Sequence, residues 1–400
     1  MIQRFFHPVG QGAFYSERHE YHEYHEYPGS TLNIVYDCGT EYMNRGKKGI
    51  RGVVTQSFSK QDVIHILFIS HFDYDHISLI KLLKDTVNRI ERVVIPLLDK
   101  KETIFLANIY RALEENEEGK EKEAHLAELV SDPKEFFGEG THVFLVQPST
   151  EKENGEKATI WLSKSDPEEN PKEIPSGSPL ILKNYGDWVF VPYNHLNKKR
   201  GEDFRAKLQA DGIDVEKLED PHYVLDEDVR QKIKACYKEI DGGINQNSMF
   251  LYSGPSVGKG VSMYFWGGGI RWDHNYHWSC FYDHYFNSDR VACLYTGDGD
   301  LGDGDLNKVN ARAVYKDYWK FIGTIQIPHH GSLPSFNDDV LKEEYLLCPI
   351  SVGKNNSYGH PSQSVISQIL FYRCCPILVT EDVCSTFVEV IRWRPRPIRD

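Results

Sequence analysis

Apolar residues occur along the chain in short runs that are separated by polar or amphipathic stretches. Residues 63–69 form one such run, which is unbroken and rich in β-branched side chains, as expected of a strand buried on both faces. Apolar residues at roughly helical spacing follow it, at Ile77, Ile80, Leu82 and Leu83. Runs of the same kind recur to the end of the chain and predict an α/β fold. Further strands are expected at residues 31–36, 90–97, 188–191, 249–252, 291–295, 325–327, 347–352, 377–380 and 387–393.

The chain is long enough to bury a large core, because it has 400 residues of which 40% are apolar. We expect one domain over residues 1–400, since no linker separates two units. Three segments are interpreted as insertions on that scaffold: 99–185, 197–240 and 254–290. The first two are charged and largely helical, and a solvated helical face is the default explanation for charge such as the acidic segment 114–118.

The segment 254–290 is rich in aromatic side chains, with histidines among them, and suggests an aromatic-rich hairpin. Such a segment can form a stacking surface for bases, worth about 1–3 kcal/mol per base, or a satellite core under a hairpin. The core is favoured, because the interleaved residues are Asp and His more than Lys or Arg. Residues 19–27 repeat His-Glu-Tyr, which allows loose metal binding, but a period of three favours a solvated loop. Residues 150–178 are polar and are expected to form an exposed loop.

Charge and cysteine content narrow the class of protein. The formal net charge is −13, so the surface as a whole repels polyanions, and any nucleic-acid contact needs a local basic patch or a partner. No apolar run approaches the roughly 20 residues of a membrane span, and the N-terminus lacks a signal-peptide pattern. Eight cysteines without paired spacing are typical of reduced thiols. We therefore expect a soluble cytoplasmic protein.

Histidines and aspartates gather where the predicted strands end. His71, Asp73, Asp75 and His76 directly follow the strand at residues 63–69. A polar turn with Asp75 as a helix cap would need one aspartate, whereas two histidines with two aspartates suit a divalent metal. In a layered sheet fold the carboxyl ends of parallel strands lie on one edge, so similar residues at other strand ends converge there. Those residues are Asp37, Asp298, His329, His330 and His360.

The order of these motifs resembles the metallo-β-lactamase-fold hydrolases, and more narrowly their competence-type (DNA-internalisation) branch. The matching motifs span nearly the whole chain outside the insertions. They are Gly10-Gln11-Gly12, Asp37-Cys38-Gly39, His71-x-Asp73-x-Asp75-His76, Asn247-Ser248, Thr296-Gly297-Asp298, His329-His330-Gly331-Ser332 and Gly359-His360-Pro361. The resemblance implies a four-layer αββα sandwich with one or two metal ions at the edge of the two sheets.

The resemblance also implies roles for individual residues. Asp298 is expected to bridge two divalent ions, Mn²⁺ or Zn²⁺. The other expected ligands are His71, Asp73, Asp75, His76, His330 and His360. Catalytic roles are expected for Asp75, Asp298, His329 and His330. Asp75 or Asp37 would orient a ligand histidine or the attacking hydroxide, and one histidine of the pair 329–330 would ligate while the other protonates the leaving oxygen.

Two positions bear on this expectation. At position 73 most of the superfamily has histidine, whereas this chain has Asp73, as the competence-type branch also has. The extra carboxylate shifts the expected metal preference from zinc towards manganese. The usual middle histidine has no clear counterpart; His195 is the one candidate at a strand end, against the alternative of an ordinary surface histidine.

The leading functional hypothesis is a metal-dependent phosphodiesterase or nuclease that uses a metal-bridging hydroxide. The second is hydrolysis of a small ester, lactone or thioester. The third is a metal-stabilised subunit of a multi-protein complex, possibly a bacterial defence complex, whose insertions dock partners. Nucleic acid or a nucleotide is the expected substrate. The competence protein's membrane channel domain has no counterpart here, so DNA transport is not expected.

Overall fold

The structure is a computed structural model of the whole chain. It describes residues 1–20, 31–41, 48–114, 125–149, 157–163, 170–182, 188–197, 199, 201–239, 244, 247–256, 261–272, 275–278, 290–305, 307–342 and 345–395. Most of the His-Glu-Tyr repeat, from residue 21 onward, lies outside these residues. So do the aromatic side chains expected between residues 261 and 289, where only backbone strands are described. The interpretations of both segments therefore stay predictions.

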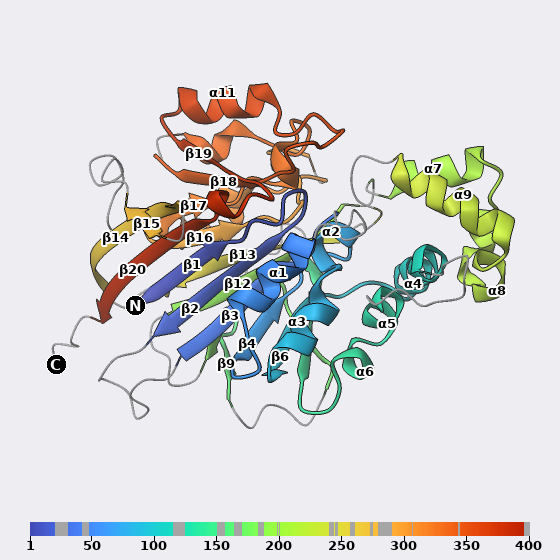
Figure 1. Cartoon of the computed structure of the whole chain (residues 1–400), viewed down its shortest axis with the longest axis horizontal. Coiled ribbons are helices and arrows are strands. Elements are labelled where there is room, and N and C mark those ends of the chain that lie inside the picture. Colours follow the sequence, from blue (N-terminus) through green and yellow to red (C-terminus); the bar gives the residue numbers. More distant parts are fainter. Residues whose placement is uncertain are drawn as a thin grey trace.

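The described residues form a mixed α/β structure with two large sheets (Figure 1). The strands of the first sheet are, in order, β10 (Lys172–Ile174), β7 (His142–Val146), β6 (Arg92–Pro96), β4 (Val63–Phe68), β3 (Thr31–Cys38), β2 (Phe14–Glu20), β1 (Ile2–Phe6), β20 (Phe387–Pro395), β14 (Val261–Trp272) and β15 (Asn275–Trp278), with β5 (Arg89–Ile90) beside β4. Those of the second are β19 (Cys375–Val379), β18 (Leu347–Ser351), β17 (Ile322–Ile325), β16 (Ala292–Tyr295), β13 (Asn247–Pro255), β12 (Trp188–Leu196), β11 (Leu180–Leu182) and β9 (Ile160–Leu162), with β8 (Pro148–Ser149) beside β12.

Each sheet contains a parallel block. In the first sheet β3, β4, β6, β7 and β10 run parallel, and in the second β16, β17, β18 and β19 do. The predicted α/β class is confirmed, and the predicted strands at 63–69 and 31–36 match β4 and β3 closely. The carboxyl ends of these parallel strands lead into the loops that carry the predicted site residues.

Apolar side chains from both sheets pack together in one core. Examples are Phe6 and Ile34 from the first sheet and Met249 and Leu251 from the second, each at most 2% exposed. The alternation of side chains along a strand explains which residues enter this core: in β1, Ile2 and Phe6 point towards the second sheet and are fully buried.

A set of charged side chains is also buried between the sheets. Arg4 lies 2.9 Å from a Glu17 carboxylate oxygen and 2.7 Å from one of Glu389, and these three side chains are at most 2% exposed. We call them the inter-sheet ion network. The second sheet completes it, because the Tyr295 hydroxyl donates to Glu17 at 3.0 Å and the Thr324 hydroxyl donates to Glu389 at 2.6 Å. Burial alone would lower the pKa of Arg4, but the two glutamates hold that pKa well above its usual value.

Helices pack on the outer faces of the sheets. Helices α1 (Lys48–Ser57) and α3 (Ile80–Thr86) contribute to an apolar core on the first sheet, and α11 (Gln363–Phe371) contributes to one on the second. Shorter helical turns are α6 (Pro133–Phe137), α10 (Ala311–Val314), η3 (Trp319–Phe321), η5 (Asp338–Leu341) and η6 (Val383–Ser385). None of the helices in the described part of the chain is long and apolar enough to cross a membrane.

Two predicted insertions join into one helical unit. It consists of α4 (Lys100–Glu114), α5 (Leu126–Ser131), α7 (Glu202–Ala210), η1 (Val215–Glu219), α8 (Pro221–Val224) and α9 (Glu227–Lys238), which Figure 1 shows grouped on one side of the molecule. Asn108 of α4 donates to the Leu218 carbonyl at 2.8 Å, and Arg205 of α7 lies 2.7 Å from Glu102 of α4. Helix α4 is therefore more buried than its charge suggests.

The sequence interpretation was incomplete between residues 141 and 182. Strands β7 and β10 of this stretch extend the first sheet, and β8, β9 and β11 extend the second. The expected exposed loop at 150–178 thus contains two short strands within its described residues. Their alternation is only three residues long, which is too short for a periodic signal.

Candidate metal centre

The central loop of the site, residues 69–77, follows β4 and ends in a single helical turn, α2 (Tyr74–Ile77); we call it the ligand loop. Asp73 occupies the N-cap position of α2 with an extended backbone, yet its side chain makes no capping hydrogen bond. Asp75 lies inside the first turn. The alternative that Asp75 caps the helix is therefore wrong, and both carboxylates are left for another role.

Glycines allow this loop to pack closely against its neighbours. A Cβ on Gly39, just after β3, would lie 2.4 Å from the backbone oxygen of Asp75. A Cβ on Gly12, whose φ is +149°, would lie 2.7 Å from the same oxygen. That oxygen accepts a hydrogen bond from the Ala13 N–H at 3.1 Å. The two glycine motifs noted in the sequence therefore bring the backbone of β3 and of the 10–13 loop against the ligand loop.

Asp37 supports the loop from behind. It is fully buried at the end of β3 with a φ of 54°, a conformation that Asp and Asn tolerate better than other non-glycine residues. Its carboxylate accepts the Ser70 N–H and the Ser70 hydroxyl, each at 2.7 Å, and it lies 2.9 Å from His76 Nδ1. Because a carboxylate only accepts, Nδ1 of His76 carries the proton.

The other histidines are oriented in the same way, through Nδ1. Ser70 Oγ lies 2.7 Å from His71 Nδ1 and, since its own proton goes to Asp37, accepts the Nδ1 proton. The Ser351 carbonyl lies 2.8 Å from His330 Nδ1, and the Ser335 hydroxyl lies 3.1 Å from His329 Nδ1. Proteins commonly fix metal-binding histidines by such bonds on the far nitrogen.

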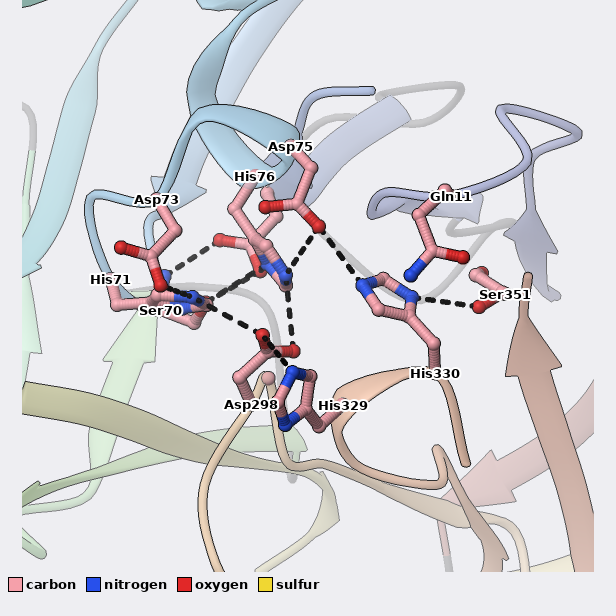
Figure 2. Close-up of polar contacts among 12 residues, drawn as sticks. Gln11, Ser70, His71, Asp73, Asp75, His76, Asp298, His329, His330 and Ser351 are labelled. Atoms are coloured by element: carbon pink, nitrogen blue, oxygen red, sulfur yellow. Dashed lines mark hydrogen bonds and ion pairs between the residues drawn. The ribbon is translucent and has the colours of Figure 1, made fainter. Parts of the chain in front are cut away.

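The Nε2 atoms of these histidines face a group of carboxylates (Figure 2). His76 Nε2 lies 3.1 Å from Asp298, and His71 Nε2 lies 3.6 Å from Asp298 and 3.2 Å from Asp73. Both nitrogens are buried and neither makes a hydrogen bond. Buried polar atoms without such partners are rare in proteins and call for an explanation.

Two sets of potential metal ligands are formed among the described residues. One consists of His71, His76 and Asp298, and the other of Asp75, His76 and His330; within each set the ligand atoms lie within 4.8 Å of one another. His76 belongs to both sets, so the two positions are adjacent. Figure 2 shows Asp298 below His76, with His71 on one side and His330 on the other. The donor chemistry, the burial and the Nε2 atoms without hydrogen bonds fit a bound divalent cation.

Opposite charges set the protonation of the site. Burial alone would lower the pKa of His76, but Asp298 and Asp75 raise that pKa well above its usual value. The carboxylates facing His71 and His330 likewise outweigh burial and raise both of their pKa values. Burial alone would raise the pKa of Asp75, but the charge of His76 and the hydrogen bond from His330 Nε2, at 2.9 Å, lower it to about 2.

The pKa of Asp298 is also low. Burial alone would raise it, but His76 and His329 hold it well below the usual value. The negative charge of Asp298 and Asp75 therefore stabilises a positive charge at the neighbouring imidazoles, whether that charge is a bound proton or a bound metal ion. A site with this balance of charge favours a cation in the space between Asp298 and the Nε2 atoms.

The remaining predicted residues lie around these two sets. His329 Nε2 is 3.9 Å from Asp298, and the ring of His360 lies 5.7 Å from that of His329 between centroids. Asp73 contacts His71. Among the described residues, neither ligand set contains Asp73, His329 or His360. The structure thus places Asp75 and His330 in one set and Asp298 in the other, with His360 outside both; the expected ligand and catalytic roles stay predictions.

His195 lies in β12, where it pairs with Ser248 of β13, and it is 4% exposed. The alternative of an ordinary surface histidine is therefore wrong, because the residue is buried. It is absent from both ligand sets of the described residues. Its expected ligand role stays a prediction.

Sequence reasoning missed the serines that orient the histidines. Ser70 stands next to His71, so its position could have been noticed, but its contact with Asp37 joins residues 33 positions apart. Ser351 acts through its carbonyl, which any residue type provides. No known protein-family profile matches this chain, and no curated protein sequence matches it.

Proposed function

We propose that the protein is a metal-dependent hydrolase of the metallo-β-lactamase type, with a four-layer αββα arrangement and a phosphodiester as its substrate. The observation that carries the proposal is the pair of adjacent ligand sets that share His76, in which the loop after β4 meets Asp298 from the end of β16 and His330 from the end of β17. The packing of helices against two sheets that share a core supports the fold assignment.

The residues divide into binding and proton-transfer roles. His71 and Asp298 would hold one divalent cation and Asp75 and His330 a second, with Asp73 beside His71; His76 Nε2, which has one lone pair, would ligate one of the two. The chemistry that bound divalent cations supply is a lowered pKa for water and a positive clamp on phosphoryl oxygens. Asp37 and Ser70 keep the Nε2 atoms of His71 and His76 unprotonated for ligation.

His329 is the proposed general acid. Its Nε2 faces Asp298 at 3.9 Å, its Nδ1 is fixed by Ser335, and its side chain is 12% exposed, more than that of His330. As the water oxygen forms a bond to phosphorus, the carboxylate of Asp75 takes the proton that the water loses, and as the bond to the leaving oxygen breaks, His329 Nε2 gives its proton to that oxygen. Asp298 holds the imidazolium that supplies it.

The choice of a phosphodiester rests on the carboxylates. Three aspartates, Asp73, Asp75 and Asp298, surround the imidazoles, so the donor set is hard and suits manganese as well as zinc. Hard cations of this kind clamp phosphoryl oxygens in two-metal sites. The net charge of −13 favours a short, single-stranded or cyclic substrate over long duplex.

The test is cleavage of labelled substrates by the purified full chain with Mn²⁺ or Zn²⁺. The substrates are single- and double-stranded DNA, RNA, cyclic dinucleotides and a generic aryl ester. The variant is Asp298→Asn, which keeps the shape of the side chain, and the matched control is Asp132→Asn, since Asp132 caps α6 and Asn caps helices equally well. We expect phosphodiester cleavage that needs metal, persists in the control and falls at least 100-fold in Asp298→Asn.

Three outcomes would contradict the proposal. Cleavage that survives in Asp298→Asn would come from a contaminant. Hydrolysis of the ester without any phosphodiester would move the assignment to small-ester chemistry. Elemental analysis that finds less than one metal ion per chain, after purification with added Mn²⁺ and Zn²⁺, would remove the two-cation site.

A further inference from the structure

The ligand loop presents alternate side chains to two different environments. His71, Asp73 and Asp75 face the candidate metal centre, whereas Phe72 and Tyr74 pack into the apolar core that contains α4 and the other helices of the helical unit. Phe72 is 2% exposed. The helical unit is therefore in contact with the residues between the ligands, although it supplies no ligand of its own among the described residues.

Two tyrosines of the helical unit reach the backbone of this loop. The hydroxyl of Tyr110, a fully buried residue of α4, donates to the carbonyl oxygen of Phe72. Tyr237, in α9, interacts with Tyr110 and with the backbone of Tyr74. A buried hydroxyl in an apolar core is costly unless it is satisfied, and the Phe72 carbonyl of the ligand loop satisfies the hydroxyl of Tyr110.

The two contacts lie on either side of Asp73. The Phe72 carbonyl lies in the peptide before Asp73 and the Tyr74 nitrogen lies in the peptide after it, so these contacts hold the two peptide planes on either side of Asp73, between His71 and Asp75. Small errors in ligand position matter, since metal sites depend on outer partners that orient the first set of ligands. Helix α4 comes from one predicted insertion and α9 from another, so the contacts of Tyr110 and Tyr237 with the ligand loop, which we call the tyrosine clamp, form only when both insertions are folded together.

We infer that Tyr110 and Tyr237 are positioning residues for the metal ligands, and that the helical unit is a working part of the metal centre. This inference rests on the proposed function, because it assumes that His71, Asp73 and Asp75 face a cation. It assigns a role to the helical insertions, which the motifs of the ligand loop do not predict.

The test compares Tyr110→Phe and Tyr237→Phe with Tyr223→Phe in the full chain. Tyr223 is the matched control, because it lies in α8 of the same helical unit and its hydroxyl accepts the Asp214 N–H at 2.9 Å, away from the ligand loop. The measurements are Mn²⁺ and Zn²⁺ affinity by titration calorimetry, the visible absorption of bound Co²⁺, and thermal unfolding in EDTA. Absorption of Co²⁺ reports ligand geometry, which a purely structural role would not change.

We expect Tyr110→Phe to weaken metal binding about 10- to 100-fold and to alter the Co²⁺ spectrum. Tyr237→Phe should have the same sign, and Tyr223→Phe should match the wild type in both readouts. If the wild type binds metal and both clamp variants bind it with unchanged affinity and spectrum, this inference is wrong and the proposed function stands. If the wild type binds no metal, both are wrong. Should Tyr110→Phe fail to fold, Tyr237→Phe decides by the same criteria.

Discussion

Replacing Asp37 by Asn tests whether the site depends on the tautomers of its histidines. Asn keeps the volume and tolerates the φ of 54° at this position, so the change is confined to hydrogen bonding. One oxygen can still accept the Ser70 N–H, but the other oxygen becomes an NH₂ group that faces Ser70 Oγ and His76 Nδ1. Two donors would then meet, unless His76 moves its proton to Nε2.

The expected magnitude follows from these contacts. A proton on Nε2 of His76 removes a ligand from both sets, and the reversed Ser70 hydroxyl acts in the same direction on His71. Loss of such a supporting residue lowers metal affinity about 10- to 100-fold, or about 1.4–2.8 kcal/mol. Without metal, the loss of charge-assisted hydrogen bonds should lower the free energy of unfolding by about 1.5–3 kcal/mol.

Metal affinity is measured by calorimetry, unfolding by denaturant titration in EDTA, and the tautomers by ¹⁵N NMR of the imidazoles. The control is again Asp132→Asn, in which an exposed capping aspartate is replaced and no change is expected. A folded Asp37→Asn protein that binds Mn²⁺ and Zn²⁺ as tightly as the wild type would refute the reasoning, because it would show that the Nδ1 bonds do not set ligation.

Three further predictions concern the scaffold. Arg4→Met removes the buried cation between two buried carboxylates of the inter-sheet ion network and should lower the free energy of unfolding by about 3–5 kcal/mol, measured by urea titration. Burial lowers the pKa of His7 from 6.5 to about 3. Between those pH values the unfolded chain binds more protons than the folded chain, so the free energy of unfolding falls as the pH falls. His7→Gln should remove about 2 kcal/mol of this loss between pH 7 and pH 5. Gly39→Ala places a Cβ 2.4 Å from the backbone of the ligand loop and should abolish tight metal binding. At Gly49 in α1 an added Cβ has no atom within 4 Å, so Gly49→Ala should raise the free energy of unfolding by about 0.5–1 kcal/mol.

Each of these predictions has a contrary outcome. Wild-type stability of Arg4→Met would mean that the two glutamates are protonated or hydrated in the folded state. An unchanged pH profile in His7→Gln would mean that the histidine is not buried as a neutral group. Equal metal binding by the two glycine variants would show that the ligand loop has room to move.

The sequence was informative about the site where chemistry and strand ends coincide. His71, Asp75 and Asp298 each follow a short apolar run, and the rule that parallel strands end on one edge was enough to bring them together. Residues whose role depends on a distant partner were not predictable. Arg4 reads as an ordinary polar position of a strand, and its burial depends on Glu389, which lies 385 positions further along the chain. Tyr110 reads as part of an amphipathic helix, and its hydroxyl partner is set by how two insertions meet.

The pairing of β1 with β20 has a consequence for how the chain acquires its structure. Residues 2–6 lie beside residues 387–391 in the first sheet, so β1 has no partner on that side until residues 387–391 have been synthesised. Until then its edge is unpaired, and the Arg4 guanidinium lacks one of its two carboxylates. Contacts of such long sequence separation form slowly and expose aggregation-prone edges meanwhile. The pairing of β1 with β20 is therefore among the last contacts of the first sheet that a nascent chain can make.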